Sequence, residues 1–291
     1  MYVAELRRQI SQCGQKYAQS RGVPHRLSYG AMPAVVFEPD EDARLHGNFL
    51  EASYRAILKN SQWHRRLTKA HSQRKVLPEA AHGCWRELDS CHSSDALLMN
   101  VFCHPKTLCT AAVQNLLGVE AGAVAEFGYR TRVPLAIGKF DRTEVDMRIG
   151  NLLVESKLTE ADFQRKSKAF AEAYRDFHEV FDCRRLPQTS TNYLSYQLLR
   201  NVLAAHAIQG SFCVLADQRR PDMLEAWFAV MQAVKPIELR TRCKVLTWQE
   251  LTTVLPKRLQ SFLREKYLIV AAGNSPHANA YRVTWPSKDY D

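Results

Sequence analysis

The sequence predicts a mixed α/β protein, and three observations support that fold class. Two runs after Gly122, residues 123–135 and 142–150, alternate apolar and polar side chains as half-buried strands do. A third run, residues 151–158, is apolar enough for a buried strand. Helical spacing precedes and follows these runs. We therefore expect a three-strand meander, with later strands returning through helical crossovers.

The part of the chain before the meander is predicted to be mainly helical. Residues 1–45 are mixed, and the Pro- and Gly-containing stretch from 21 to 47 indicates loop and short extended pieces. Ser93 or Ser94 can cap a helix that starts at Asp95. The run 107–117 again has helical spacing and is closed by Gly118.

The part after the meander alternates helices and strands. Thr159, with Asp162 three residues on, predicts the capped start of a long helix whose buried stripe includes Phe163, Phe170 and Phe177. The remaining predictions are helices over 192–207 and 223–234, strands over 211–217 and 243–246, a capping box of Thr247 and Glu250, a last helix from Pro256, and an irregular tail over 273–291.

The charge balance favours a polyanionic partner. Lys plus Arg is 40 and Asp plus Glu is 30, which gives a net charge of +10 and a pI of about 9.3. Nucleic acid fits such a basic excess, although a basic surface without such a partner is the plainer alternative. No apolar run is as long as a membrane span, and the first residues lack the core of a signal peptide. We therefore expect a cytoplasmic protein without membrane contact, with reduced cysteines.

One segment concentrates the positive charge. Between Ala52 and Pro78 there are seven Lys and Arg residues and no Asp or Glu, on a stretch with partial helical spacing. This is a candidate footprint for a phosphate backbone; the alternative is a solvated helix face. The residues we assign to nucleic-acid binding are Arg65, Arg66 and Lys69, together with Arg130 and Arg132 of the first strand run.

The cysteines show no metal-ligand spacing. The chain has 8 Cys and no CxxC pair, and the nearest cluster runs irregularly from Cys84 through Cys91 and Cys103 to Cys109. A structural metal there is one interpretation. Small buried hydrophobic side chains are the favoured one.

The chemistry-bearing residues lie on the second and third strand runs. Gly150-Asn151 predicts a tight turn, so the two runs fold back as a hairpin. Glu144, Asp146 and Arg148 should then share one face, with Val145, Met147 and Ile149 on the other. Glu155 and Lys157 share a face of the next strand, so Asp146, Glu155 and Lys157 can meet at one end of the sheet.

Two carboxylates at a sheet edge suit Mg²⁺, which prefers oxygen ligands and keeps several waters; Mn²⁺ can substitute. A bound metal activates water and neutralises charge on a scissile phosphate, while Lys157 can orient the water or hold the phosphate. The spacing alone is a weak signal. The strand–turn–strand–helix context strengthens it, against the alternative of an exposed ion pair.

Asp146 with Glu155-Ser156-Lys157 resembles the PD-(D/E)XK nuclease superfamily, and the chain is similar to bacterial restriction-endonuclease-like members of it. Val145 replaces the Pro of the motif. The resemblance implies a core of helix, three-strand meander, helix and fourth strand, over about residues 95–217. It predicts a basic, mostly helical N-terminal elaboration (1–94), a nuclease core with C-terminal α/β additions (95–272) and an irregular tail (273–291).

The resemblance also implies auxiliary residues. Members of the superfamily often add an acid from a preceding helix or strand, and Glu126 and Glu87 are the candidates, with Glu126 preferred. Some exonuclease-like branches carry a Gln and a Tyr on a helix after the motif. Gln197, next to Tyr196, fits that position, and ordinary helix hydrogen bonding is the alternative.

The leading function is therefore a Mg²⁺-dependent DNA endonuclease of restriction, repair or defence type, with Asp146 and Glu155 as metal ligands. The second is a nuclease-like module that binds nucleic acid without cutting it. A cysteine-based enzyme or sensor is the third and least supported. Restriction-type cleavage of both strands would favour a symmetric homodimer. No Walker-type phosphate loop occurs, which argues against a motor in this chain.

Overall fold

The computed structural model describes residues 2–29, 33–40, 42, 44–70 and 85–273. Its centre is a five-stranded sheet in the order β11-β10-β7-β6-β3. The strands β3 (Ala125–Arg130), β6 (Glu144–Ile149) and β7 (Leu152–Ser156) form the predicted antiparallel meander. The later strands β10 (Ser211–Ala216) and β11 (Cys243–Thr247) are parallel to β7 and to each other. The predicted mixed α/β class is confirmed.

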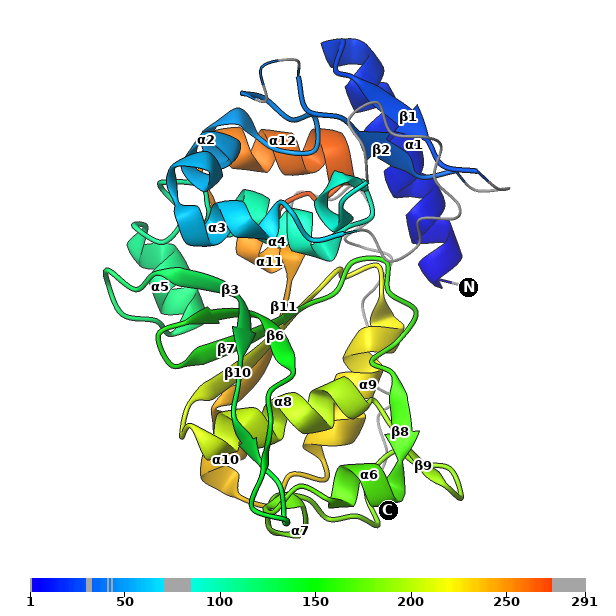
Figure 1. Ribbon diagram of the computed structural model, residues 1–291, viewed down its shortest axis with the longest axis vertical. Helices are drawn as coiled ribbons and strands as arrows, with labels where there is room; N and C mark the ends of the chain where they lie inside the picture. Colours follow the sequence, from blue (N-terminus) through cyan, green and yellow to red (C-terminus); the bar gives the residue numbers. More distant parts are fainter. Residues whose placement is uncertain (1, 30–32, 41, 43, 71–84, 274–291) are drawn as a thin grey trace, which may run out of the picture.

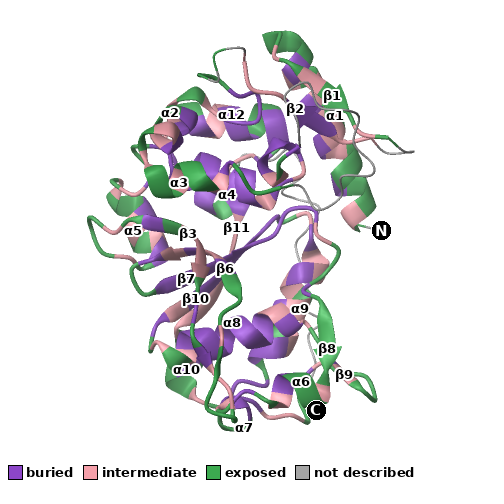
Figure 2. Ribbon diagram, viewed as in Figure 1, coloured by how far each residue is buried: buried purple, intermediate pink, exposed green. Residues whose placement is uncertain are grey.

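Helices cover both faces of the sheet (Figure 1). One core packs β7 and β10 against α1 (Tyr2–Arg21), α4 (Ser94–Phe102) and α12 (Lys257–Tyr267). The other packs the opposite face against α8 (Tyr196–Ala207) and α9 (Pro221–Met231). Figure 2 shows the burial concentrated in the central strands, α4 and α8. Within the part of the chain that can be described, no helix is long and apolar enough to cross a membrane.

Shorter elements complete the fold. The helices are α2 (Glu51–Lys59), α3 (Ser61–Arg66), α5 (Ala111–Leu117), α6 (Lys168–Glu172), α7 (Phe177–Val180), α10 (Ile237–Thr241) and α11 (Trp248–Thr252), with a 3₁₀ turn η2 (Glu87–Asp89). The small strands are β1 (His25–Leu27) with β2 (Val35–Phe37), β4 (Val133–Pro134) with β5 (Phe140–Asp141), and β8 (Arg165–Ser167) with β9 (Asn192–Leu194).

The local start and stop signals behave as expected. The Ser93 hydroxyl caps α4 by accepting from the Ala96 backbone N–H. Gly118 ends α5 with a left-handed backbone. Thr247 and Glu250 form the predicted capping box at the start of α11. The basic segment is helical over α2 and α3, whereas Arg74 and Lys75 lie outside the described residues.

The long helix predicted from Thr159 is wrong. The chain is irregular up to Gln164, pairs as β8, and then forms only the short helices α6 and α7. The reason is tertiary: the Arg220 guanidinium takes the carbonyls of Glu160 (2.7 Å) and Ala161 (3.1 Å), which a helix would have used internally. Phe163 and Phe177 are buried as expected, but Phe170 is 52% exposed.

The prediction that Val145, Met147 and Ile149 share one face also needs correction. Met147 and Ile149 pack in the core containing α4, whereas Val145 packs in the core containing α8. The change of side coincides with Gly128 of β3, whose φ of +63° interrupts the regular ladder between the Phe127–Met147 and Tyr129–Val145 pairs. The face that β6 turns toward each core therefore changes at the position of Asp146.

Candidate active site

The two acids of the motif meet where β6 and β7 part. The paired register ends at Met147 and Val154, and the next positions along the two strands are Asp146 and Glu155. The Ser156 backbone N–H donates to Asp146 Oδ2 (2.7 Å), which fixes this carboxylate against the neighbouring strand. Glu155 is 3% exposed, whereas Asp146 is only partly buried. The pair is thus held rigidly while one member stays accessible.

Lys157 completes the predicted group. Its Nζ donates to Glu155 Oε1 (2.7 Å) and to Gln197 Oε1 (3.0 Å) on α8. Asn201, also on α8, donates through Nδ2 to Glu155 Oε2 (2.8 Å). Lys157 is 5% exposed, so this ion pair lies in a low-dielectric environment. The structure therefore brings Asp146, Glu155, Lys157 and Gln197 together as the sequence predicted.

The charges at this site perturb one another. Burial, followed by the negative charges of Glu155 and Asp95, raises the pKa of Asp146 well above its usual value, despite the opposing influence of Lys157. Burial alone would lower the pKa of Lys157, but Glu155, Glu160 and Asp146 outweigh it and raise that pKa. Lys157 therefore stays protonated, whereas the charged form of Asp146 is disfavoured by its surroundings, and a cation bound beside Asp146 would stabilise that form.

Asp95 is an acid of this site that the sequence reasoning did not single out. It lies in the first turn of α4, and its charge reaches Asp146. Arg66 and Lys69 both bind its Oδ2 at 3.0 Å. Arg66 also donates to Glu144 Oε2 (2.7 Å) and is only 14% exposed. Arg66 and Lys69 therefore brace the acids of the site in this structure.

The auxiliary acids proposed from the sequence lie elsewhere. Glu126 is exposed on β3 in register with Arg148, and Glu87 begins the η2 turn. The negative charge of Asp95, in contrast, helps to raise the pKa of Asp146, after burial and the charge of Glu155. The signal that could have found Asp95 was its place in the first turn of the helix preceding the meander.

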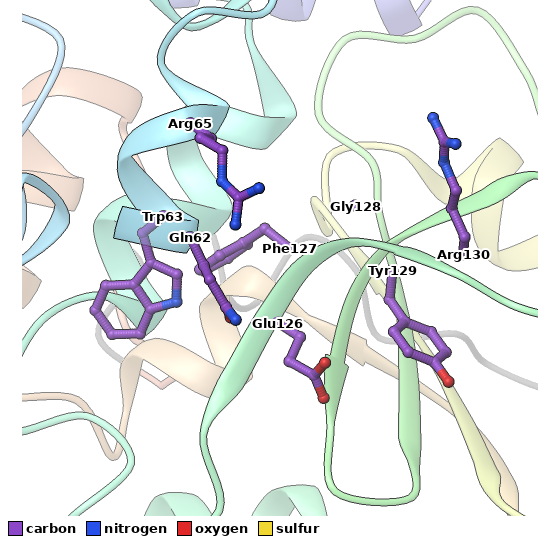
Figure 3. Close-up of a pocket in the computed structure, with 8 residues that line it drawn as sticks. All are labelled: Gln62, Trp63, Arg65, Glu126, Phe127, Gly128, Tyr129 and Arg130. Atoms are coloured by element: carbon purple, nitrogen blue, oxygen red, sulfur yellow. The ribbon is translucent and has the colours of Figure 1, made fainter. Parts of the chain in front are cut away.

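The remaining predicted cations are exposed. Arg65 and Arg130 line a shallow groove of about 300 Å³ between α3 and β3, together with Gln62, Trp63, Glu126 and Tyr129 (Figure 3). Arg130 is 72% exposed and lies 3.9 Å from Glu144. Arg132 is exposed and stacks over the Phe140 ring at 4.4 Å. Arg65 and Arg130 remain available to an external anion.

Gly128 makes room for the bracing arginine. It lies across from Asp146 in the β3–β6 register, and a side chain there would run into the Arg66 guanidinium and the Glu144 carboxylate. We expect Gly128→Ala to lower the free energy of unfolding by about 1–3 kcal/mol, because positive φ strains alanine. By displacing Arg66 it should also impair the activity that is proposed for this site below.

Gly22→Ala is the matched control, since Gly22 has a φ of +60° but nothing within 4 Å of an added Cβ. Chemical denaturation should show the strain in both variants, and assays of that proposed activity should show a loss in Gly128→Ala alone. Equal activity of the two variants would contradict this role for Arg66.

The side chains at the site determine which metal ion it could hold. No group of three or more His, Cys, Asp or Glu arranged to hold a metal occurs among the residues described. This covers the cysteine cluster as far as it is described: Cys91 and Cys103 are buried, Cys109 is exposed, and Cys84 lies outside the described part. Asp146 and Glu155 still fit Mg²⁺, which typically binds one or two carboxylates and completes its shell with water and substrate oxygens.

Comparison with known proteins identifies a family for this chain. The model of a family described as Restriction Endonuclease associating with ARP matches residues 6–268. No curated protein and no solved structure matches the chain. The match spans the meander, the carboxylate pair and the helices that brace it. The chain belongs to the REase-ARP family, Restriction Endonuclease associating with ARP.

Proposed function

We propose that the chain is a divalent-metal-dependent DNA nuclease that cuts phosphodiester bonds within strands. The observation that carries the proposal is the juxtaposition of Asp146, Glu155 and Lys157 where β6 and β7 part, with burial and then the charge of Glu155 raising the pKa of Asp146. Membership of a restriction-endonuclease-associated family supports a nuclease-type activity. The resemblance of Asp146 and Glu155-Ser156-Lys157 to the motif of PD-(D/E)XK nucleases also supports the proposal.

Each residue then has a role set by its contacts. Asp146 and Glu155 would hold Mg²⁺, which when bound supplies an activated water and neutralises charge developing on the phosphate. Asp146 is partly exposed, and no hydrogen bond from the described residues reaches its Oδ1, so it can bind a cation without losing its bond to Ser156. Glu155 is held by Lys157 and Asn201, and its remaining lone pairs can face the same cation.

Lys157 acts as a cation and not as a base. The neighbouring acids raise its pKa, so its ammonium stays protonated at neutral pH. A protonated ammonium can donate to the attacking water or to a phosphate oxygen and can stabilise negative charge in the transition state. Gln197 holds the ammonium in place from α8.

Exposed cations of the groove would hold the DNA backbone. We expect the double variant Arg65→Glu/Arg130→Glu to weaken DNA binding and to reduce the slope of log K against log salt by about 2, since each phosphate contact contributes roughly 0.9. Fluorescence anisotropy across a salt series measures both quantities.

The control is Arg184→Glu/Arg240→Glu, which changes the net charge equally at two exposed positions near the α7 and α10 end of the molecule (Figure 1). Identical salt slopes for the two double variants would show that the groove does not contact the backbone.

The nuclease activity itself is tested with purified wild-type protein on supercoiled plasmid, linear duplex and single-stranded DNA. Cleavage with Mg²⁺ or Mn²⁺ that stops in EDTA is the expected result, and nicking of closed circles would identify an endonuclease. Salt-sensitive DNA binding without cleavage of any substrate would overturn the proposal in favour of a binding module.

A further inference from the structure

Helix α8 reaches the strand that carries Asp146 through a buried arginine. Arg200 is 3% exposed, and its guanidinium donates to the carbonyls of Thr143 and Glu144, each at 2.7 Å. Thr143 directly precedes β6 and Glu144 begins it, three and two residues before Asp146 respectively. The planar fork of an arginine fixes two acceptors at once, so the start of β6 is held at a set distance from α8.

The next residue of α8 reaches the other strand. Arg200 also donates to Asn201 Oδ1 (2.6 Å), and Asn201 Nδ2 donates to Glu155 Oε2 (2.8 Å). Asn201 is fully buried, and both the oxygen and the nitrogen of its side-chain amide form hydrogen bonds. One continuous chain of hydrogen bonds therefore runs from the β6 backbone through Arg200 and Asn201 to the carboxylate on β7.

This chain spans the place where the sheet no longer holds the two strands together. The β6–β7 register ends at Met147 and Val154, so the sheet ladder stops just before the Asp146 and Glu155 positions. Without another link, the separation of the two carboxylates would depend on the bond between Ser156 and Asp146. Burying the Arg200 guanidinium costs desolvation free energy. Its hydrogen bonds to the two carbonyls offset that cost only because their geometry is good.

We propose that Arg200 and Asn201 are positioning residues that set the separation and orientation of the Asp146 and Glu155 carboxylates for a divalent cation. The inference rests on the proposed function and deepens it. We call Arg200 and Asn201 together the clamp. Displacing catalytic groups by about 1 Å can lower a rate about a hundredfold, so losing the clamp should have a measurable effect.

The test uses the full chain with two substitutions, Asn201→Leu and Arg200→Lys. Leucine has a similar volume but removes both hydrogen bonds of Asn201, whereas lysine keeps the charge of Arg200 but lacks the two-pronged fork. Asn115→Leu, at an exposed position of α5, is the matched control. Three quantities are measured well below the melting temperature: kcat, KM for DNA, and Mn²⁺ affinity by calorimetry without DNA.

Both variants are expected to lower kcat at least tenfold, to leave KM within about twofold, and to weaken Mn²⁺ binding, while the control matches wild type. A merely structural role would lower the melting temperature and leave these quantities unchanged, and that outcome overturns the proposal. If Asn201→Leu does not fold, Arg200→Lys decides by the same criteria. If wild type binds Mn²⁺ but cuts nothing, the nuclease proposal fails, and weaker Mn²⁺ binding by the variants would still support the clamp.

Discussion

Asp146→Asn is expected to reduce DNA cleavage by about a thousandfold or more while making the metal-free protein more stable. The rate falls because a metal held less well no longer stabilises the transition state, a contribution of several kcal/mol, and each 1.4 kcal/mol is tenfold. Asn Oδ1 can still accept the Ser156 N–H, so local structure is retained. Plasmid cleavage and thermal unfolding in EDTA measure the two effects.

The stability gain should depend on pH. The folded pKa of Asp146 is raised, so the stability that this carboxyl contributes is present below its unfolded pKa and is lost as pH rises through its folded pKa. Asparagine does not titrate. The gain of Asp146→Asn over wild type in EDTA should therefore grow from acidic to neutral pH. Asp162→Asn, an exposed control, should cut normally and show no such gain. Full cleavage by Asp146→Asn would contradict the site.

Lys157→Met is expected to abolish cleavage and to destabilise the fold by about 3–5 kcal/mol. The lysine is the buried counter-ion of Glu155, and removing one partner of a buried pair leaves the other charge uncompensated. The loss of cleavage has a separate cause, namely the absence of a cation near the phosphate. Urea unfolding in EDTA and cleavage with Mg²⁺ measure the two losses.

The double variant Lys157→Met/Glu155→Gln separates these causes. It removes both charges, so most of the lost stability should return, while cleavage should stay absent. A Lys157→Met protein that is stable and cuts at the wild-type rate would show that neither the ion pair nor the cation matters at this position.

The fold was predictable from sequence where its determinants are local. The β6–β7 hairpin follows from alternation and the Gly150-Asn151 turn, and the Thr247 capping box needs only four consecutive residues. Residues 159–177 were not predictable in this way, because Arg220 binds their carbonyls from about 60 residues away. Helix α1 lies in residues 1–45, a mixed stretch for which the sequence analysis predicts no separate helix. The helical spacing of its buried residues was nevertheless present: Leu6, Ile10, Gly14 and Ala18.

Local sequence likewise predicts some residues of the candidate site and not others. Asp146, Glu155 and Lys157 follow from the hairpin register, which the sequence determines. Asp95 and Asn201 reach the site from helices that are distant in sequence. Asp95 had a local signal, its place in the first turn of α4, whereas nothing in the sequence around Asn201 marks it as a contact of the sheet. Arg66 shows that a run of positive charge in the sequence does not reveal what each charge binds. Its sequence context indicated DNA binding, whereas in the structure it forms ion pairs with Asp95 and Glu144.

The most direct test of a metal-dependent site at this sheet edge is the anomalous diffraction of crystals soaked in Mn²⁺. We expect one strong peak within coordination distance of both Asp146 and Glu155, and its loss in Asp146→Asn crystals. A peak bound elsewhere, or none at a Mn²⁺ concentration that supports cleavage in solution, would contradict it.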